Sequence, residues 1–113
     1  GCDGHLGYVQ PDVGKWGGIS GCRDVALAAA ALGPGGPVFC PHWLAGGVGL
    51  AASLHLRAAM GDGGFAEIDA NPNPLRDALW RIPVVDGHIH LPQTPGIGVE
   101  PDPAWLAAHE VRA

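Results

Sequence analysis

The chain repeats one arrangement three times within its first 70 residues: a short apolar segment ends near an ionisable side chain. The ionisable residues are Asp12, His42 and Glu67, and the intervals between them are 30 and 25 residues. The apolar segments are short and bounded by glycine or proline, which predicts strands at 7–10, 37–40 and 64–68. This repeat constrains the chain to a fold in which strands recur at nearly regular intervals.

Helices are predicted between these strands. Ser20 is suited to cap the first helix, and Gly33-Pro34 ends it. Its apolar stripe has helical spacing and comprises Cys22, Val25, Ala26, Ala29 and Ala30. The second helix follows the loop at 45–47, is apolar nearly all round, and ends at Met60. Alternation of strands and helices argues for an α/β fold with a parallel sheet.

The chain changes character after Asp69, so we divide it into βα units at 1–70 and a tail at 71–113. In the tail we expect a short helix from Pro74 to Trp80 and an edge strand within 84–92. A last helix is expected around Trp105, capped at Asp102. The spacing of the first part suits a (β/α)8 barrel, which averages about 31 residues per unit, although a doubly wound sheet would space similarly.

Composition excludes several classes of protein. The formal net charge is −5, with one lysine and five arginines, so no basic surface for nucleic acid is expected. No apolar run approaches the ~18 residues that a membrane span needs. The chain has an odd number of cysteines without paired spacing: Cys2, Cys22 and Cys40. This pattern favours reduced thiols and a cytoplasmic location.

The strand ends carry the candidate site. Active sites of barrels lie at the carboxyl ends of the strands, so Asp12, His42 and Glu67 are expected to converge in one pocket. A carboxylate beside an imidazole fixes its tautomer and makes it a general base, and a second carboxyl group could bind an oxygen on which charge develops. Alternatively, the carboxylates are ion-pair or helix-terminal groups and His42 is a buried histidine with a satisfied hydrogen bond.

Three runs of the sequence resemble a known family: QPDVGKWGGIS at 10–20, Pro41-His42, and the Glu67-Ile-Asp69 run. They are similar to strands six, seven and eight of the mandelate racemase and muconate lactonising enzyme family, in the enolase superfamily. The later segment from Asp86 to Gly98 resembles that family's return to its capping domain. The likeness extends over nearly the whole chain from Tyr8.

This resemblance implies a partial barrel and a chemistry. The chain would contain barrel strands six to eight and a C-terminal segment that returns to the capping domain. His42 matches the general acid/base, Asp12 its dyad partner, and Glu67 the residue that contacts the substrate carboxylate or enediolate. Lys15 matches a lysine after strand six, and Trp16 and Trp43 follow strands, where they would wall the pocket. We assign these three to substrate binding.

The resemblance also implies groups that lie outside this sequence. In the family, an enediolate formed by loss of the proton next to a carboxylate is held by Mg²⁺, whose ligands lie on strands three to five. The second base lies on strand two. We therefore expect a C-terminal piece of an acid-sugar dehydratase or racemase, inactive by itself, with a small carboxylate substrate such as a sugar acid. Intact family members are expected to be homo-oligomers, and exposed sheet edges should make the isolated chain associate.

Two other readings stay open. The chain could be a non-catalytic remnant that folds or associates without activity. His88 and His90 resemble the His-x-His motif of amidohydrolases, and on a strand they would face the same side. Amidohydrolases place this motif on the first barrel strand, ahead of a long barrel, and only 23 residues of this sequence follow His90, so this reading is less favoured. Cys40 could be a nucleophile, although a lone cysteine in an apolar strand more often packs in a core.

Overall fold

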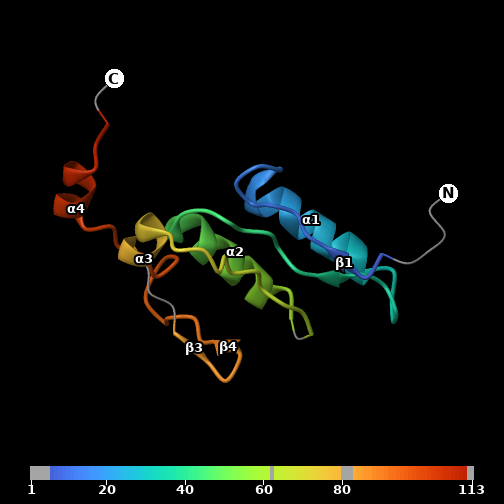
Figure 1. Cartoon of the computed structure of the whole chain (residues 1–113). Helices are drawn as coiled ribbons and strands as arrows, with labels where there is room; N and C mark the ends of the chain where they lie inside the picture. The colour runs from blue at the N-terminus through green and yellow to red at the C-terminus, as the bar shows by residue number, and fades with distance from the viewer. Residues whose placement is uncertain (1–5, 62, 80–82, 112–113) are drawn as a thin grey trace.

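A computed structural model describes residues 6–61, 63–79 and 83–111 of the chain. The first half alternates strands and helices, as predicted, and the second half holds short elements (Figure 1). In order, the elements are β1 (Tyr8–Val9), α1 (Gly18–Ala30), β2 (Val38–Phe39), α2 (Gly47–Ala59), α3 (Pro74–Leu79), β3 (Val84–Val85), β4 (His88–Ile89) and α4 (Pro103–Ala108). The expected end of the third helix at Trp80 lies outside the described residues.

β1 and β2 form a parallel pair with Tyr8 opposite Val38 and Val9 opposite Phe39. The pairing continues past both strands, because a further parallel bridge joins Asp12 to His42. Backbone hydrogen bonds of 2.9, 3.0 and 3.1 Å run from Val38, Cys40 and His42 to Gly7, Val9 and Pro11. The parallel sheet is therefore confirmed, and its register places the first two predicted site residues side by side.

The third predicted strand, at 64–68, is wrong. The segment is extended, but among the described residues no backbone hydrogen bond joins it to β1 or β2. It lies near the sheet through side chains instead: the rings of Tyr8 and Phe65 are tilted, with centroids 6.2 Å apart. A strand needs cross-strand backbone bonds, and the sheet here has two strands where a barrel would supply more neighbours.

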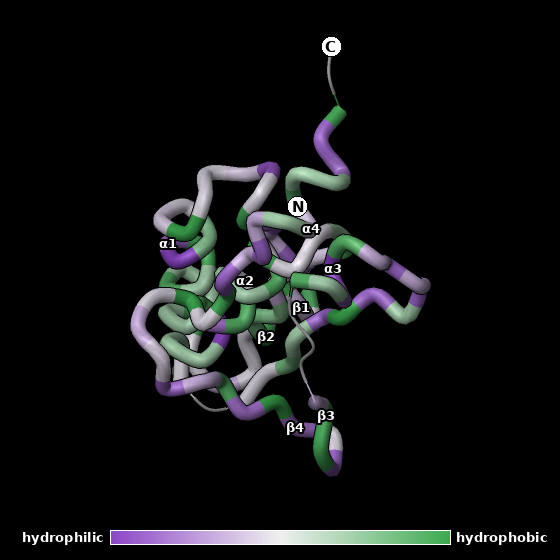
Figure 2. Tube along the Cα trace, turned by 90° about the vertical axis from the view of Figure 1, so that its left-hand side faces the viewer, coloured by the Kyte–Doolittle hydropathy of each residue, from purple (hydrophilic) through white to green (hydrophobic). Residues whose placement is uncertain are grey.

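A small core joins the sheet to the two long helices. Cys22 and Ala26 of α1 pack with Phe39 of β2 and Leu56 of α2, and partly buried Val9, Val13 and Met60 surround them. Figure 2 shows this cluster of α1, α2, β1 and β2, from which the β3–β4 hairpin projects. The predicted helix stripe is confirmed at Cys22, Ala26 and Ala29, which are buried, whereas Val25 is half-buried and Ala30 is exposed.

The start of α1 differs from the prediction. The helix begins at Gly18 and its N-cap is Gly17, whereas Ser20 lies inside the helix and is exposed. Gly17 and Gly18 have φ values of 67° and 64°, a left-handed conformation that glycine adopts without the steric cost of a Cβ. The tight turn that these glycines permit lets the helix start earlier than a serine cap would.

The tail forms a hairpin and a capped helix. β3 and β4 pair antiparallel across the two-residue turn Asp86-Gly87, whose φ values of 50° and 75° are both positive. Asp-Gly is a strong signal for such a turn, so the predicted edge strand is in fact half of a hairpin. The predicted cap of the last helix is confirmed, since Asp102 accepts a hydrogen bond of 2.9 Å from the Ala104 N–H.

No helix within the described ranges is long and apolar enough to cross a membrane.

Candidate active site

His42 and Glu67 are in direct contact. The Nδ1 atom of His42, just beyond β2, lies 2.5 Å from Oε2 of Glu67, in the extended segment before α3. Both side chains are partly accessible, at 29% and 31%. The distance is that of an ion pair, and this buried oxygen accepts no hydrogen bond within the described part of the chain. The structure therefore pairs an imidazole with a carboxylate, as the sequence predicted, but through a different carboxylate.

Asp12 lies beside His42 on the neighbouring strand but directs its carboxylate elsewhere. Oδ1 accepts a hydrogen bond of 2.7 Å from the Gly14 N–H, and Oδ2 lies 3.0 Å from Nζ of Lys15. The predicted hydrogen bond between Asp12 and His42 is not made. Its absence has a local cause, because the turn after β1 supplies two donors only two and three residues away.

The environment of Asp12 lowers its pKa. Burial of the side chain raises this pKa, but the hydrogen bonds from Lys15 and Gly14 and the positive charges of Lys15 and His42 outweigh burial. Asp12 therefore remains a carboxylate at neutral pH, a fixed negative charge one strand from His42.

We predict that Lys15→Met raises the pKa of Asp12 and narrows the range of pH over which the chain stays folded. A carboxyl group whose pKa is depressed by folding adds stability above its ordinary value of 3.8, and this stability is lost as pH falls through the folded pKa. Without Lys15 the pKa of Asp12 in the folded chain moves closer to 3.8, so this contribution to stability is smaller and is fully lost at a higher pH. Carboxyl ¹³C titration and acid unfolding followed by circular dichroism would measure both. Arg23→Met, which removes the exposed ion pair with Asp24 on α1, is the control. The same Asp12 pKa in the natural chain, in Lys15→Met and in Arg23→Met would refute the prediction.

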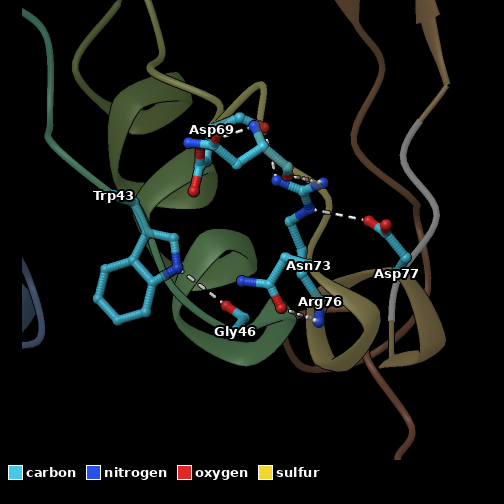
Figure 3. Close-up of polar contacts among 7 residues, drawn as sticks. Trp43, Gly46, Asp69, Asn73, Arg76 and Asp77 are labelled. Atoms are coloured by element: carbon cyan, nitrogen blue, oxygen red, sulfur yellow. Dashed lines mark hydrogen bonds and ion pairs between the residues drawn. The ribbon is translucent and has the colours of Figure 1, made fainter.

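Trp43, assigned above to substrate binding, is held by the scaffold. Its Nε1 donates a hydrogen bond of 2.9 Å to the carbonyl of Gly46, as Figure 3 shows. Its six-membered ring packs against Gly14 and Gly49, where an added Cβ would lie 2.6 and 1.9 Å from ring atoms. The ring thus joins the turn after β1 to the first turn of α2. Its contact with substrate stays a prediction.

Trp16 and Lys15 lie on the surface of the loop before α1. The Trp16 residue is 55% exposed, its ring packs near Gly21, and its carbonyl receives a hydrogen bond of 3.4 Å from Cys22 Sγ. The Lys15 side chain is 74% exposed and pairs with Asp12. Substrate binding by these two residues is likewise untested and stays a prediction.

We predict that Gly49→Ala destabilises the chain by about 1–3 kcal/mol, the usual cost of overpacking. Alanine would normally favour a helix, but its Cβ would lie 1.9 Å from Cζ2 of Trp43, whose indole is fixed by the Gly46 carbonyl. Urea unfolding measures the change. Gly7→Ala, with no atom within 4 Å of the added Cβ, should be nearly neutral. A Gly49→Ala chain as stable as the natural one would show that Trp43 is not confined.

The rival metal and thiol sites find little support. No group of three or more His, Cys, Asp or Glu side chains in the described ranges is arranged to hold a metal ion. His88 and His90 are exposed, and Nδ1 of His88 lies 2.8 Å from the Asp86 carbonyl. Cys40 is buried, and burial and the charge of Glu67 raise the pKa of its thiol. A thiol with a raised pKa is a poor nucleophile.

A groove of about 500 Å³ lies on the side of the 64–68 segment that is turned away from His42. Its walls come from the end of α2, from most of the 63–68 segment and from the hairpin, including Leu54, Arg57, Ala66, Ile68, His88 and Ile89. Ala66 and Ile68 line the groove, whereas Glu67 between them contacts His42. The groove and the candidate site are separate.

Two polar residues near the site were missed by the sequence analysis. Gln10 lies two residues before Asp12, and its Nε2 is 3.9 Å from Cys40 Sγ, two residues before His42. The period of two along a strand could have indicated this pair. Arg76, in α3, makes the polar network shown in Figure 3. Nothing in its sequence neighbourhood indicates that role.

Comparison with known proteins identifies relatives over most of the chain. The family model for an enolase C-terminal domain-like fold matches residues 2–105. An arabinonate dehydratase of Saccharolobus solfataricus is 36% identical over 92 residues, which cover 80% of this chain and 24% of the relative. A D-galactonate dehydratase of Xanthomonas euvesicatoria pv. vesicatoria is 35% identical over 113 residues, covering 93% and 29%.

The structure has a similar counterpart among solved proteins. A mandelate racemase/muconate lactonizing enzyme-like protein from Roseovarius sp. TM1035 superposes with a TM-score of 0.72 and 33% identity, over 90% of this chain and 25% of that protein. The chain spans about a quarter of the length of the curated relatives it matches.

Proposed function

Since the chain belongs to the enolase C-terminal domain-like family, we propose that it supplies the histidine acid/base of an acid-sugar dehydratase or racemase. The contact between His42 and Glu67 carries the proposal, because it orients an imidazole at the end of a parallel strand beside a second carboxylate, Asp12. We further propose that β1, α1, β2 and α2 are units of a (β/α)8 barrel. The dehydratase relatives support a sugar acid as the substrate.

In the proposed reaction His42 removes the proton on the carbon next to the substrate carboxylate. Nδ1 faces Glu67, so Nε2 is the nitrogen that takes the proton. The electron pair of the broken C–H bond moves into the carboxylate, giving an enediolate. In a dehydratase the same pair then expels the β-hydroxyl, which accepts the proton from His42 and leaves as water. In a racemase a proton returns to the carbon from the opposite face.

The neighbouring residues would tune this histidine. Glu67 lies against Nδ1 of the ring and places a negative charge beside the imidazolium that forms during the reaction. Asp12, kept ionised by Lys15, adds a negative charge that stabilises the same cation. The accessible part of Glu67 remains able to contact the substrate, as the family resemblance implies.

The Mg²⁺ that the resemblance implies has no fitting ligand set among the described residues. The two carboxylates nearest the site are engaged, Asp12 with Lys15 and Glu67 with His42. No three candidate ligands in the described ranges converge. No step above is therefore assigned to a metal.

Solvent exchange tests the proposal. The protein as its host produces it would be incubated in D₂O with arabinonate, galactonate, mandelate and other five- and six-carbon aldonates, and the α-proton followed by NMR. We expect one sugar acid to lose this proton, and in a dehydratase to lose water as well, giving a 2-keto-3-deoxy acid. Exchange without loss of water would identify a racemase. No exchange with any of these acids would favour the non-catalytic alternative.

A further inference from the structure

We infer that Arg76 is a positioning residue that holds Glu67 against His42 by clamping the turn after Glu67. Its guanidinium group makes three hydrogen bonds at once: Nη1 to the Asp69 carbonyl at 2.6 Å, Nη2 to the Asn71 carbonyl at 3.3 Å, and Nε to Asp77 Oδ1 at 2.8 Å. The side chain is only 12% exposed. Figure 3 shows the guanidinium between this turn and α3.

The clamped turn begins two residues after Glu67. Asp69 Oδ1 accepts hydrogen bonds from the backbone N–H and the side-chain amide of Asn71, at 2.9 and 2.7 Å. These bonds lower the pKa of Asp69, so its carboxylate persists at neutral pH. The turn is thus closed from within and tied to Arg76 from outside. Because Glu67 has no strand partner to fix it in the described structure, this turn is its nearest anchor.

α3 also contacts the loop that holds Trp43, the residue next to His42. Asn73 Oδ1 caps α3 by accepting a hydrogen bond of 2.9 Å from the Arg76 backbone N–H. Leu75 lies against Gly46, whose carbonyl accepts the Trp43 Nε1–H. Trp43 directly follows His42 in the chain. The short helix therefore contacts both arms of the site: the loop that carries His42 and the segment that carries Glu67.

Arginine is suited to this role. Its planar guanidinium presents several donors in a fixed fork and bonds two carbonyls and a carboxylate together, whereas lysine offers a single ammonium centre. The functional part of the inference rests on the proposed acid/base role of His42. The geometric part, that Arg76 sets the His42–Glu67 contact, does not.

The test compares Arg76→Ala and Arg76→Lys with the natural protein. If positioning fails, a displacement near 1 Å of a catalytic group can cost on the order of 100-fold in rate. We expect Arg76→Ala to lower kcat by about 10- to 100-fold with little change in KM, and to shift the His42 ring ¹⁵N resonances. Millimolar guanidinium should restore part of the rate, and Arg76→Lys should lie between the two. Arg23→Ala, which changes an exposed arginine on α1, is the matched control.

The outcomes distinguish the geometric claim, that Arg76 sets the His42–Glu67 contact, from the proposed function of His42. An Arg76→Ala protein that keeps kcat within twofold and unchanged His42 resonances would overturn the inference. If Arg76→Ala does not fold, Arg76→Lys decides, because natural kcat and natural resonances in that variant would also overturn it. If the natural protein shows no turnover, the proposed function fails, but the His42 resonances of the variants still test whether Arg76 positions the pair.

Discussion

His42→Asn should abolish turnover of the sugar-acid substrate while leaving the fold intact. A positioned acid/base contributes roughly 10²- to 10⁴-fold to a rate, and asparagine can neither take nor return a proton at neutral pH. The backbone of residue 42 would keep its hydrogen bond of 3.1 Å to the Pro11 carbonyl. Because the side chain is 29% exposed and outside the core, its replacement should change the free energy of unfolding little.

The measurement is kcat/KM in the protein as its host produces it, together with circular dichroism and urea unfolding. His90→Asn is the matched control, because His90 is exposed just beyond β4 and has no part in the proposed reaction. Activity of His42→Asn within tenfold of the natural protein would remove His42 from the proposed reaction. Equal losses in His42→Asn and His90→Asn would indicate a general effect of histidine replacement.

The arrangement of Asp12 and His42 could be predicted from sequence because it depends on backbone periodicity. Apolar segments bounded by glycine and proline specify strands, and the helices between them require a parallel crossover. The bridge between Asp12 and His42 follows from that register. The buried stripe of α1 follows in the same way from helical spacing.

The partner of His42 could not be predicted because it depends on competition between side chains in space. Gly14 and Lys15 supply donors close to Asp12, and they engage its carboxylate before His42 can. The family pattern marked Asp12 as the partner and gave no weight to this local turn. Arg76 was missed for a similar reason: its acceptors are mainly backbone carbonyls, which every sequence contains. The hairpin at Asp86-Gly87, by contrast, had a recognisable turn signal, although we predicted only a single edge strand there.

The second prediction with a large expected effect is self-association of the chain through the face of the sheet that is turned away from α1. Tyr8 is 51% exposed and Phe65 is 64% exposed, and their rings are neighbours. In the described residues β1 and β2 pair only with each other, so each also presents an unpaired edge. Exposed aromatic groups beside open strand edges favour association. We therefore expect the 113-residue chain to self-associate at micromolar concentration.

Replacing both aromatic residues should weaken this association. Burial of one large apolar side chain contributes about 1.5–3 kcal/mol, so Tyr8→Ser with Phe65→Ser should reduce the association constant by roughly 100-fold or more. Sedimentation velocity over a range of concentrations measures it. Leu32→Ser removes an apolar side chain that is 69% exposed just beyond α1, and it should leave the association unchanged because Leu32 lies outside the aromatic pair. A natural chain that stays monomeric, or a double variant that associates as strongly as the natural chain, would show that this face does not drive association.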